Sequence, residues 1–296
     1  MTGEIRLSII VGVQHSQDNL ADIMGALRPA AHPQVEFLLC HTSADPDVPA
    51  LVGKEGQVRV LRSPDDSLIP HLWRDGILAA RGERVATTTG HCIPAADWVE
   101  ALLAADLGQP AVLGGTIENH PDSDARGCAI FLQRYSAFAP PQTKHDVRDP
   151  AADNALYRRA DLLRHRNLLA RGFWEPFFHD RFRAQGLRLA LDPNLRVVHR
   201  NRYSAGQFMR QRLAHGREFG FTRASARPLP QRLLLVLLAP AVFPLLFSRI
   251  LRRALGKPLL RKQLATAWFW LPVFLLAWVA GEGLGYLTSL RRHRSL

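Results

Sequence analysis

The chain has 296 residues and a formal net charge of +12, from 38 Lys and Arg against 26 Asp and Glu. Its three cysteines are odd in number and show no C-x-x-C spacing, which argues against a disulfide framework or a zinc site. From Arg227 onward there are eleven Lys or Arg and one acid, a net of +10, so the excess charge lies beside apolar segments. This distribution suits anionic lipid head groups, and we do not expect nucleic acid as a partner.

Short apolar runs alternate with helical patterns through the first half of the chain. The apolar runs predict buried strands at 7–13, 35–40, 58–63, 84–89 and 111–117. Helical spacing between them predicts helices at 18–30, 71–83 and 95–106. Such alternation predicts an α/β fold with a mostly parallel sheet and helices on both faces. Ligands of these sheets bind outside the carboxyl ends of the strands.

The sequence becomes strongly apolar after residue 226, and we predict two domains, 1–226 and 227–296. Leu233–Ser248 has sixteen uncharged residues, about 24 Å of helix at 1.5 Å per residue, and contains Pro240 and Pro244. Leu264–Leu290 is long enough to cross the roughly 30 Å core of a bilayer. The sequence therefore predicts a membrane-associated helical segment at this end.

The topology of that segment stays open at this stage. A hairpin through the membrane with a cytoplasmic domain would export six Lys and Arg between Arg249 and Gln263, against the positive-inside tendency. A first segment that is re-entrant or lies in the interface avoids this conflict. Two buried helices of a soluble domain are a third possibility.

Residues 85–98 read VATTTGHCIPAADW, so a histidine stands at the end of a predicted strand. Four other stretches keep a fixed order with it: LSIIVGVQHSQDNL (7–20), VEFLLCHTSAD (35–45), WRDGILAARGERVATTT (73–89) and GFWEPFFHDRFRAQGLRLALDPNLRVVHR (172–200). Together they resemble the family 2 glycosyltransferases, over residues 6 to about 220. The resemblance implies the GT-A fold, inverting sugar transfer and C-terminal membrane helices.

The general base implied by the resemblance is Glu175. The family's pattern of an acid, an arginine six residues on and a glycine five further falls on Glu175, Arg181 and Gly186. Inverting transfer needs a base to deprotonate the acceptor hydroxyl, and an apolar collar of Trp174, Pro176 and the following phenylalanines would raise the pKa of this carboxyl. The alternative is that Glu175 only favours the first turn of a helix.

The resemblance also implies residues that bind the two substrates. The donor-binding candidates are Gly12, Val13, Gln14, His41, Asp45, Arg74, Asp75, Arg210 and Arg212. Cys40 and His41 stand where acids usually recognise the nucleoside. The acceptor-binding candidates are Gly114, Gly115, Asn154, Trp174 and Arg181.

The family's metal motif, Asp-x-Asp, falls on Thr89 and His91, so both carboxylates are missing. We name His91 as the candidate metal ligand, and a divalent cation, Mn²⁺ or Mg²⁺, as a possible cofactor. Imidazole is a poor Mg²⁺ ligand but acceptable for Mn²⁺. Arginines could instead neutralise the diphosphate, or the donor could be a lipid-linked phosphate sugar.

We therefore expect a membrane-bound glycosyltransferase that moves a sugar from a nucleotide- or lipid-phosphate-activated donor to a lipid or glycan acceptor. Its expected location is the inner membrane of a bacterium, with the catalytic domain in the cytoplasm. The alternative is a catalytically degenerate GT-A protein that binds a glycan, nucleotide or protein without turnover, which the missing acids favour.

Overall fold

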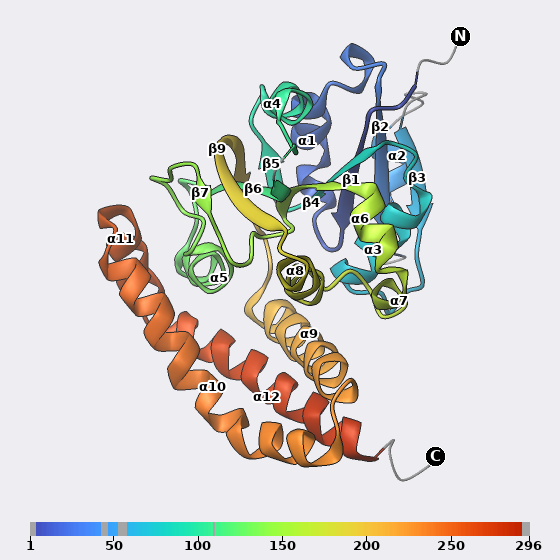
Figure 1. Cartoon of the computed structure of the whole chain (residues 1–296). Helices are drawn as coiled ribbons and strands as arrows, with labels where there is room; N and C mark the ends of the chain where they lie inside the picture. The colour runs from blue at the N-terminus through green and yellow to red at the C-terminus, as the bar shows by residue number, and fades with distance from the viewer. Residues whose placement is uncertain (1–3, 43–46, 53–57, 109, 292–296) are drawn as a thin grey trace. The chain divides into compact units, whose positions relative to one another are not determined.

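The computed structural model describes residues 4–42, 47–52, 58–108 and 110–291 (Figure 1). The chain forms two compact units. Unit 1 comprises Met1–His120 and Phe138–Asn201, and unit 2 comprises Pro121–Ala137 and Arg202–Leu296. This division differs from the predicted boundary at residue 226, because two helices of more polar composition, at 125–135 and 205–225, pack with the apolar C-terminal helices.

Unit 1 is built on one sheet of nine described strands in the order β3-β2-β1-β4-β8-β6-β9-β5, with β7 paired to β9. The strands are β1 (Leu7–Val13), β2 (Val35–His41), β3 (Val58–Arg62), β4 (Arg84–Thr89), β5 (Cys92–Pro94), β6 (Pro110–Asn119), β7 (His145–Asp146), β8 (Asn154–Arg158) and β9 (Arg188–His199). The pairs β1–β2, β1–β4, β2–β3 and β6–β9 are parallel, whereas β8 is antiparallel to both of its neighbours. The expected mostly parallel sheet is confirmed.

The helices of unit 1 connect the strands. They are α1 (Leu20–Leu27), α2 (Val48–Val52), α3 (Ile69–Ala79), α4 (Trp98–Ala104), α6 (Arg159–Arg164), α7 (Arg166–Leu169) and α8 (Glu175–Ala184), with short 3₁₀ turns at Gln17–Asn19 and Pro29–Ala31. The three predicted helices form, but each is shorter than its apolar pattern. Every residue of β1 and β2 is buried, as expected for strands covered on both faces.

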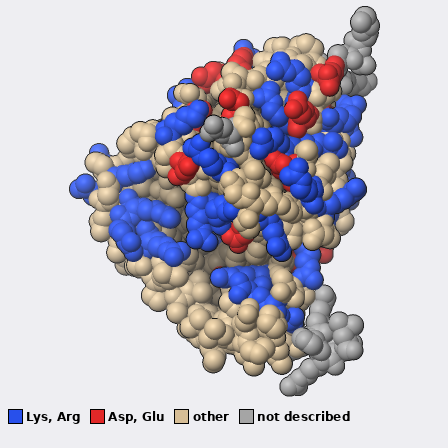
Figure 2. Space-filling view, in the orientation of Figure 1, with Lys and Arg blue, Asp and Glu red and all other residues tan. Residues whose placement is uncertain are grey.

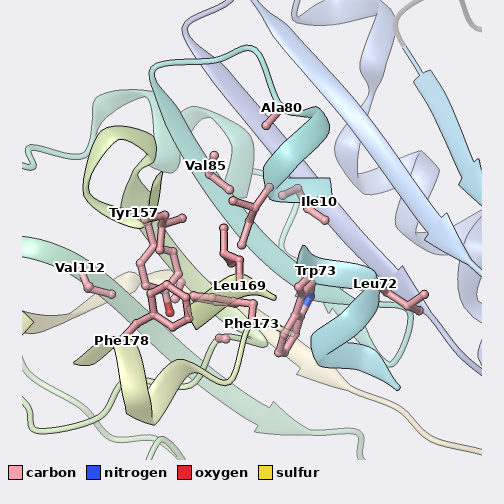
Figure 3. Close-up of a cluster of buried hydrophobic side chains, with 14 of the residues drawn as sticks. Ile10, Leu72, Trp73, Ala80, Val85, Val112, Tyr157, Leu169, Phe173 and Phe178 are labelled. Atoms are coloured by element: carbon pink, nitrogen blue, oxygen red, sulfur yellow. The ribbon is translucent and has the colours of Figure 1, made fainter. Parts of the chain in front are cut away.

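The main core cluster lies where α3 and α8 pack on the sheet (Figure 3). Aromatic rings dominate it. Phe173 lies 5.3 Å from Tyr157 and 4.8 Å from Phe178, measured between ring centroids, and Trp73 lies 6.3 Å from Phe173. Edge-to-face contacts of this kind add to the free energy of burial. The cluster fixes the start of α8, where Glu175 stands, against β8.

Glu36, the second residue of β2, is a deeply buried carboxylate, with 1% of its surface exposed. Ser8 Oγ donates to Glu36 Oε1 at 2.7 Å and itself accepts from Gly82 N at 2.8 Å. Arg81 Nε and Arg59 Nη1 donate to Glu36 Oε2 at 2.9 and 3.2 Å. Burial acts to raise the pKa of Glu36, but the hydrogen bonds from Ser8 and Arg81 outweigh it and lower that pKa.

We expect Glu36→Ala to lower the free energy of unfolding by about 2–4 kcal/mol, because it leaves the Ser8 hydroxyl and two guanidinium groups without their acceptor. Both arginines keep access to solvent, with 39% and 62% of their side chains exposed, so the loss stays below that of a fully buried pair. Chemical denaturation followed by tryptophan fluorescence measures it. Glu83→Gln, on an exposed side chain nearby, is the matched control and should change stability by less than about 0.5 kcal/mol.

Unit 2 contains only helices among its described residues: α5 (Ala125–Tyr135), α9 (Ala205–Ser225), α10 (Leu229–Leu255), α11 (Pro258–Ala267) and α12 (Trp270–Arg291). The first predicted apolar segment is a longer helix than expected, and α10 continues through Pro240 and Pro244. The second predicted segment divides into α11 and α12. Two helices, Leu229–Leu255 and Trp270–Leu290, are long and apolar enough to cross a membrane by length and composition.

Candidate functional site

The carboxyl ends of β1, β2 and β4 meet at one edge of the sheet in unit 1. Gly12 is in register with Cys40 of β2 on one side and with Thr89 of β4 on the other. The turn after β4 stays attached to β1, since Gly90 N donates to the Gly12 carbonyl at 2.9 Å. The candidate site is built at this edge, as expected for an α/β sheet.

The end of β1 supplies Gly12, Val13 and Gln14, all of them buried. Gln14 Nε2 donates to the carbonyl of Ser67 at 3.0 Å, which ties this strand end to the segment before α3. The carbonyl of Gln14 lies 3.2 Å from His91 Nε2. All three are donor-binding candidates from the sequence, and they lie at the carboxyl edge of the sheet.

The neighbouring strand ends supply the other donor candidates of unit 1. His41 ends β2 in register with Val13, and its Nδ1 lies 3.0 Å from the carbonyl of Thr42. Arg74 and Asp75 lie on α3, where Asp75 accepts hydrogen bonds from Ser63 Oγ at 2.5 Å and from Arg74 Nε at 2.8 Å. Ser63 directly follows β3, so these side chains also belong to the carboxyl edge. Asp45 lies outside the described residues.

The end of β4 receives a carboxylate that sequence analysis did not single out. Thr89 Oγ1 lies 3.4 Å from Asp153 Oδ1, and both side chains are buried. Asp153 directly precedes β8, which pairs with β4 in antiparallel register. The end of β4 therefore carries no acid of its own, but the residue before its partner strand β8 supplies a carboxylate. The next residue, Asn154, was an acceptor-binding candidate from the sequence, but the register that brings Asp153 to Thr89 could not be predicted.

His91 is the candidate metal ligand, and the residues around it do not fit a cation held by paired carboxylates. Its imidazole is 2% exposed, with Nε2 at the carbonyl of Gln14 and its ring 6.3 Å from the ring of His199. Within the described part of the chain, no three His, Cys, Asp or Glu residues are placed to share a metal ion. Thr89 contributes a hydroxyl where a hard cation needs a carboxylate oxygen.

Three of the acceptor candidates serve the packing of the sheet. Asn154 is completely buried: its Oδ1 accepts from Trp98 Nε1 at 2.9 Å, and its Nδ2 donates to the carbonyls of Thr116 and Leu195 at 3.0 and 2.9 Å. A Cβ on Gly115 would lie 2.1 Å from the carbonyl of Leu195, and one on Gly114 would lie 2.4 Å from Pro150 Cβ. The space that a side chain would need at these two glycines is filled by neighbouring protein groups.

Glu175, the candidate base, is the first residue of α8 and is half-buried. Trp174 before it is 5% exposed and donates through Nε1 to the carbonyl of Arg171 at 2.9 Å. Phe178, one turn later, is completely buried. The carboxylate thus has the apolar collar on one side and access to solvent on the other. Arg181, on the same helix, is exposed.

A series of polar side chains in contact with one another lies close to the first turn of α8, where Glu175 stands. Tyr157 Oη lies 3.3 Å from His179 Nε2, and His179 Nδ1 lies 3.6 Å from Asp149 Oδ1. Arg183 Nη1 donates to the same Asp149 oxygen at 3.1 Å. Tyr157 and His179 are completely buried, whereas Asp149 is partly open to solvent. His179 follows Glu175 by four residues, so the two side chains share one face of α8.

The pKa of Tyr157 reflects its burial and the carboxylates around it. Burial raises the pKa of Tyr157 well above its ordinary value, and the charges of Glu175, Asp153 and Asp149 raise it further. Glu175 on α8 and Asp153 at the end of β4 therefore act on one phenol. Asp153, directly before β8, and Tyr157, within it, are four residues apart, an even number, so in extended backbone their side chains leave the same face of the sheet.

Lowering the pH should destabilise the chain through His179. Burial lowers the pKa of His179, and the neighbouring Asp149 only partly offsets this effect. Unfolding then takes up a proton, so stability falls as the pH drops through about 6.5, the ordinary pKa of histidine. The pKa of Asp149 is lowered, because hydrogen bonds from His179 and Arg183 outweigh burial, so Asp149 stays ionised in this range.

We expect His179→Gln to make the fall in thermal stability between pH 7 and pH 5 less steep than in the unmodified chain. Thermal unfolding in a buffer series measures it. His145→Gln, on an exposed side chain, is the control and should leave the slope unchanged. An unaltered slope in His179→Gln would contradict the assignment.

Arg210 and Arg212, the remaining donor candidates, lie on α9 in unit 2. Arg210 is exposed, whereas Arg212 is 7% exposed. The guanidinium of Arg212 stands over the rings of Phe208 and Trp278, at 5.0 and 5.5 Å from their centroids, and donates to Gln211 Oε1 at 3.0 Å. Arg212 therefore contributes to helix packing within unit 2.

Comparisons with known proteins give similarity in structure only. No protein-family model and no curated protein sequence matches the chain. Among solved structures, the mannosyltransferase PcManGT from Pyrobaculum calidifontis, in complex with GDP-Man and Mn²⁺, is 14% identical with a TM-score of 0.53, over 95% of this chain and 88% of that one. S. aureus TarS residues 1–349 were solved with UDP (13% identity, TM-score 0.50) and with UDP-GlcNAc (11% identity, TM-score 0.51), each over 97% of this chain and 92% of that one.

At these identities the matches establish the fold. The chain has a GT-A-like fold, with a mixed α/β sheet that is mostly parallel and two long apolar helices at the C-terminal end. The fold expected from the sequence resemblance is confirmed. The mannosyltransferase was solved with a metal ion, whereas the strand end of the present chain carries Thr89 and His91.

Proposed function

We propose that this protein is a membrane-attached, inverting glycosyltransferase that uses Glu175 as its general base. The observation that supports this most is that the charges of Glu175 and Asp153 both act on the buried phenol of Tyr157, while Asp153 lies at Thr89 at the end of β4. Two acids at the carboxyl edge of an α/β sheet provide a base and a polar wall for a sugar. The GT-A-like fold and the donors bound by the two similar proteins, GDP-Man and UDP-GlcNAc, point to an activated sugar.

In the proposed reaction Glu175 removes the proton from an acceptor hydroxyl while the acceptor oxygen forms a bond to the anomeric carbon. The bond from that carbon to the phosphate oxygen breaks at the same time, and the phosphate leaves with its electron pair. The attack comes from the face opposite the leaving group, so the configuration inverts. The aromatic collar favours proton uptake by Glu175, since a less hydrated carboxylate is a stronger base.

The chain of Tyr157, His179 and Asp149 positions the base. It fills the space beneath the first turn of α8 with hydrogen-bonded groups, which sets the direction of that helix against β8. The nucleoside is assigned to the ends of β1 and β2, through Gly12, Val13, Gln14 and His41, with Arg74 and Asp75 beside them on α3. Trp174 and Arg181 remain the acceptor candidates, and the apolar helices of unit 2 attach the chain to a membrane, which suits a lipid-linked acceptor.

A second candidate function is binding of a glycan or nucleotide without turnover. One observation favours it: the end of β4 carries Thr89 and His91, so the leaving phosphate has no cation held by strand carboxylates. Measured turnover decides between the two candidates.

We expect Glu175→Gln to lower the release of nucleoside diphosphate by at least about 100-fold, because the amide cannot take the acceptor proton. The assay uses the full chain in membranes with a panel of nucleotide sugars and lipid extracts. Asp180→Asn, an exposed carboxylate on the same helix, is the matched control and should retain activity within a few-fold. Equal activity in Glu175→Gln and the control would rule out Glu175 as the base.

We expect the same activity to persist in excess EDTA, because the residues at the end of β4 do not fit a cation held by paired carboxylates. Initial rates across an EDTA titration measure this, with magnesium added back as the control. Complete loss of activity in EDTA, restored by magnesium or manganese, would show that a metal is required. Its ligands would then include residues other than those at the end of β4.

A further inference from the structure

Helix α12 is the central helix of unit 2. Of its most apolar stretch 39% is buried within the chain, against 6% for α10. Phe274, Leu275 and Tyr286 are each no more than 1% exposed. Near its start, Gln133 of α5 donates to the Phe274 carbonyl at 3.4 Å. Helix α12 is therefore more covered by protein than α10, although Leu276, Leu284 and Leu287 stay exposed.

The backbones of α12 and α9 are in direct contact through two pairs of glycines. A Cβ on Gly216 would lie 2.4 Å from the Trp278 carbonyl, and one on Gly220 would lie 2.4 Å from the Glu282 carbonyl. From the other side, a Cβ on Gly281 or Gly285 would come within 2.2 Å of an α9 carbonyl. Both helices thus carry a G-x-x-x-G spacing at their shared surface. They are fixed to each other as one rigid pair.

Helix α9, which packs against α12, carries several charged residues. Arg210, Arg217, Glu218 and Arg223 all lie on α9. Arg223 Nη1 donates to Glu282 Oε1 at 3.1 Å, and the same carboxylate accepts from Trp278 Nε1 at 3.1 Å and from the Tyr286 hydroxyl. If α12 crossed a bilayer, α9 would bring these charges into the hydrocarbon, at about 2.5–3.5 kcal/mol or more for each arginine. The α9–α12 pair is therefore unsuited to spanning.

Helix α10 is joined to the same pair at its first turns. Arg232 Nη2 donates to the carbonyl of Ser225 at the end of α9 at 3.1 Å, and its Nη1 donates to the Ser289 carbonyl of α12 at 3.0 Å. From Arg232 to Arg249 the uncharged stretch covers sixteen residues, about 24 Å of helix and less than the roughly 30 Å of a bilayer core. α10 is thus tethered at one end, and its uncharged stretch is shorter than the bilayer core.

The outer face of α10 is nevertheless strongly apolar. Its exposed leucines, between 46% and 76% exposed, are Leu229, Leu233, Leu234, Leu237, Leu238, Leu245 and Leu255. Figure 2 shows an extended surface without charge over α10, with Lys and Arg gathered over α11 and the adjoining end of α10. Those cations are Arg249, Arg252, Arg253, Lys257, Arg261 and Lys262. Trp268 and Phe269, 72% and 51% exposed, follow directly. A patch of this size and composition matches a lipid surface with anionic head groups.

We infer that unit 2 is a monotopic anchor: α10 lies in one leaflet of an anionic membrane with its leucines inserted, and neither α10 nor α12 crosses the bilayer. The cations of α10 and α11 contact the head groups of the same leaflet. This inference rests on the membrane attachment in the proposed function and does not depend on sugar transfer. Among the alternatives that the sequence left open, it selects a first segment that lies in the interface.

Two positions on α10 test the orientation. Leu237 and Leu255 are eighteen residues apart, five helical turns, so they face the same way and lie about 27 Å apart along the axis. The full chain is reconstituted in phosphatidylcholine vesicles containing phosphatidylglycerol, with a spin label on Leu237→Cys or Leu255→Cys. The native cysteines are buried, so the added cysteines react first. Accessibility to oxygen and to a water-soluble relaxation agent gives the depth of each label.

An interfacial helix places both labels at similar, shallow depth, within about 5 Å of each other, whereas a spanning helix separates them by most of the 27 Å. Arg210→Cys, at an exposed position on α9, is the control, and its label should show the accessibility of bulk water. A spanning depth profile overturns the inference and leaves the proposed sugar transfer intact.

The charge contribution is tested by the double variant Arg252→Gln with Arg261→Gln. It should weaken binding to the anionic vesicles by roughly 10- to 30-fold and change binding to neutral vesicles little. Equal affinity for both vesicle types in the unmodified chain would overturn the lipid preference. Failure to bind either type would overturn membrane attachment itself, while turnover with soluble donor and acceptor would still test the transferase.

Discussion

One buried amide, Asn154, determines where the catalytic candidates lie. Its side chain joins Trp98 of α4 to the carbonyls of Thr116 on β6 and Leu195 on β9, with no exposed surface. The amide leaves no room for a Cβ on Gly115, so the residues at this junction constrain one another. Because β8 starts at Asn154, the preceding residue Asp153 is held at the end of β4. A carboxylate is thereby supplied to a strand end that lacks its own.

The second constraint is the aromatic cluster under α8. It buries Tyr157 and His179 between the sheet and the helix, and it leaves Glu175 on the rim. The collar and the polar side chains of Tyr157, His179 and Asp149 therefore hold the first turn of α8, and with it the candidate base, against the sheet. Packing in unit 2 depends instead on glycines, whose close contacts let the charged helix α9 cover the apolar helix α12.

The sequence predicted the parallel half of unit 1 well, since buried strands such as Leu7–Val13 and Val35–His41 are continuous apolar runs with local signals. It could not predict contacts that depend on register, such as Thr89 with Asp153, or the packing roles of Asn154 and Gly114. The charged helix α9 carries no apolar stripe that would assign it to the C-terminal helices. Its packing against α12 depends on glycines 65 residues further along the chain, which no local pattern reveals. The base, donor and acceptor assignments remain predictions.

The most direct measurement of the central claim is an experimental structure of the chain with a nucleoside-diphosphate sugar bound. The account predicts the nucleoside at the ends of β1 and β2 and the sugar beside Thr89 and Asp153. An acceptor oxygen should then fit within about 3 Å of both the anomeric carbon and the Glu175 carboxylate. A donor bound on another face, or a protein wall between the anomeric carbon and Glu175, would contradict the account.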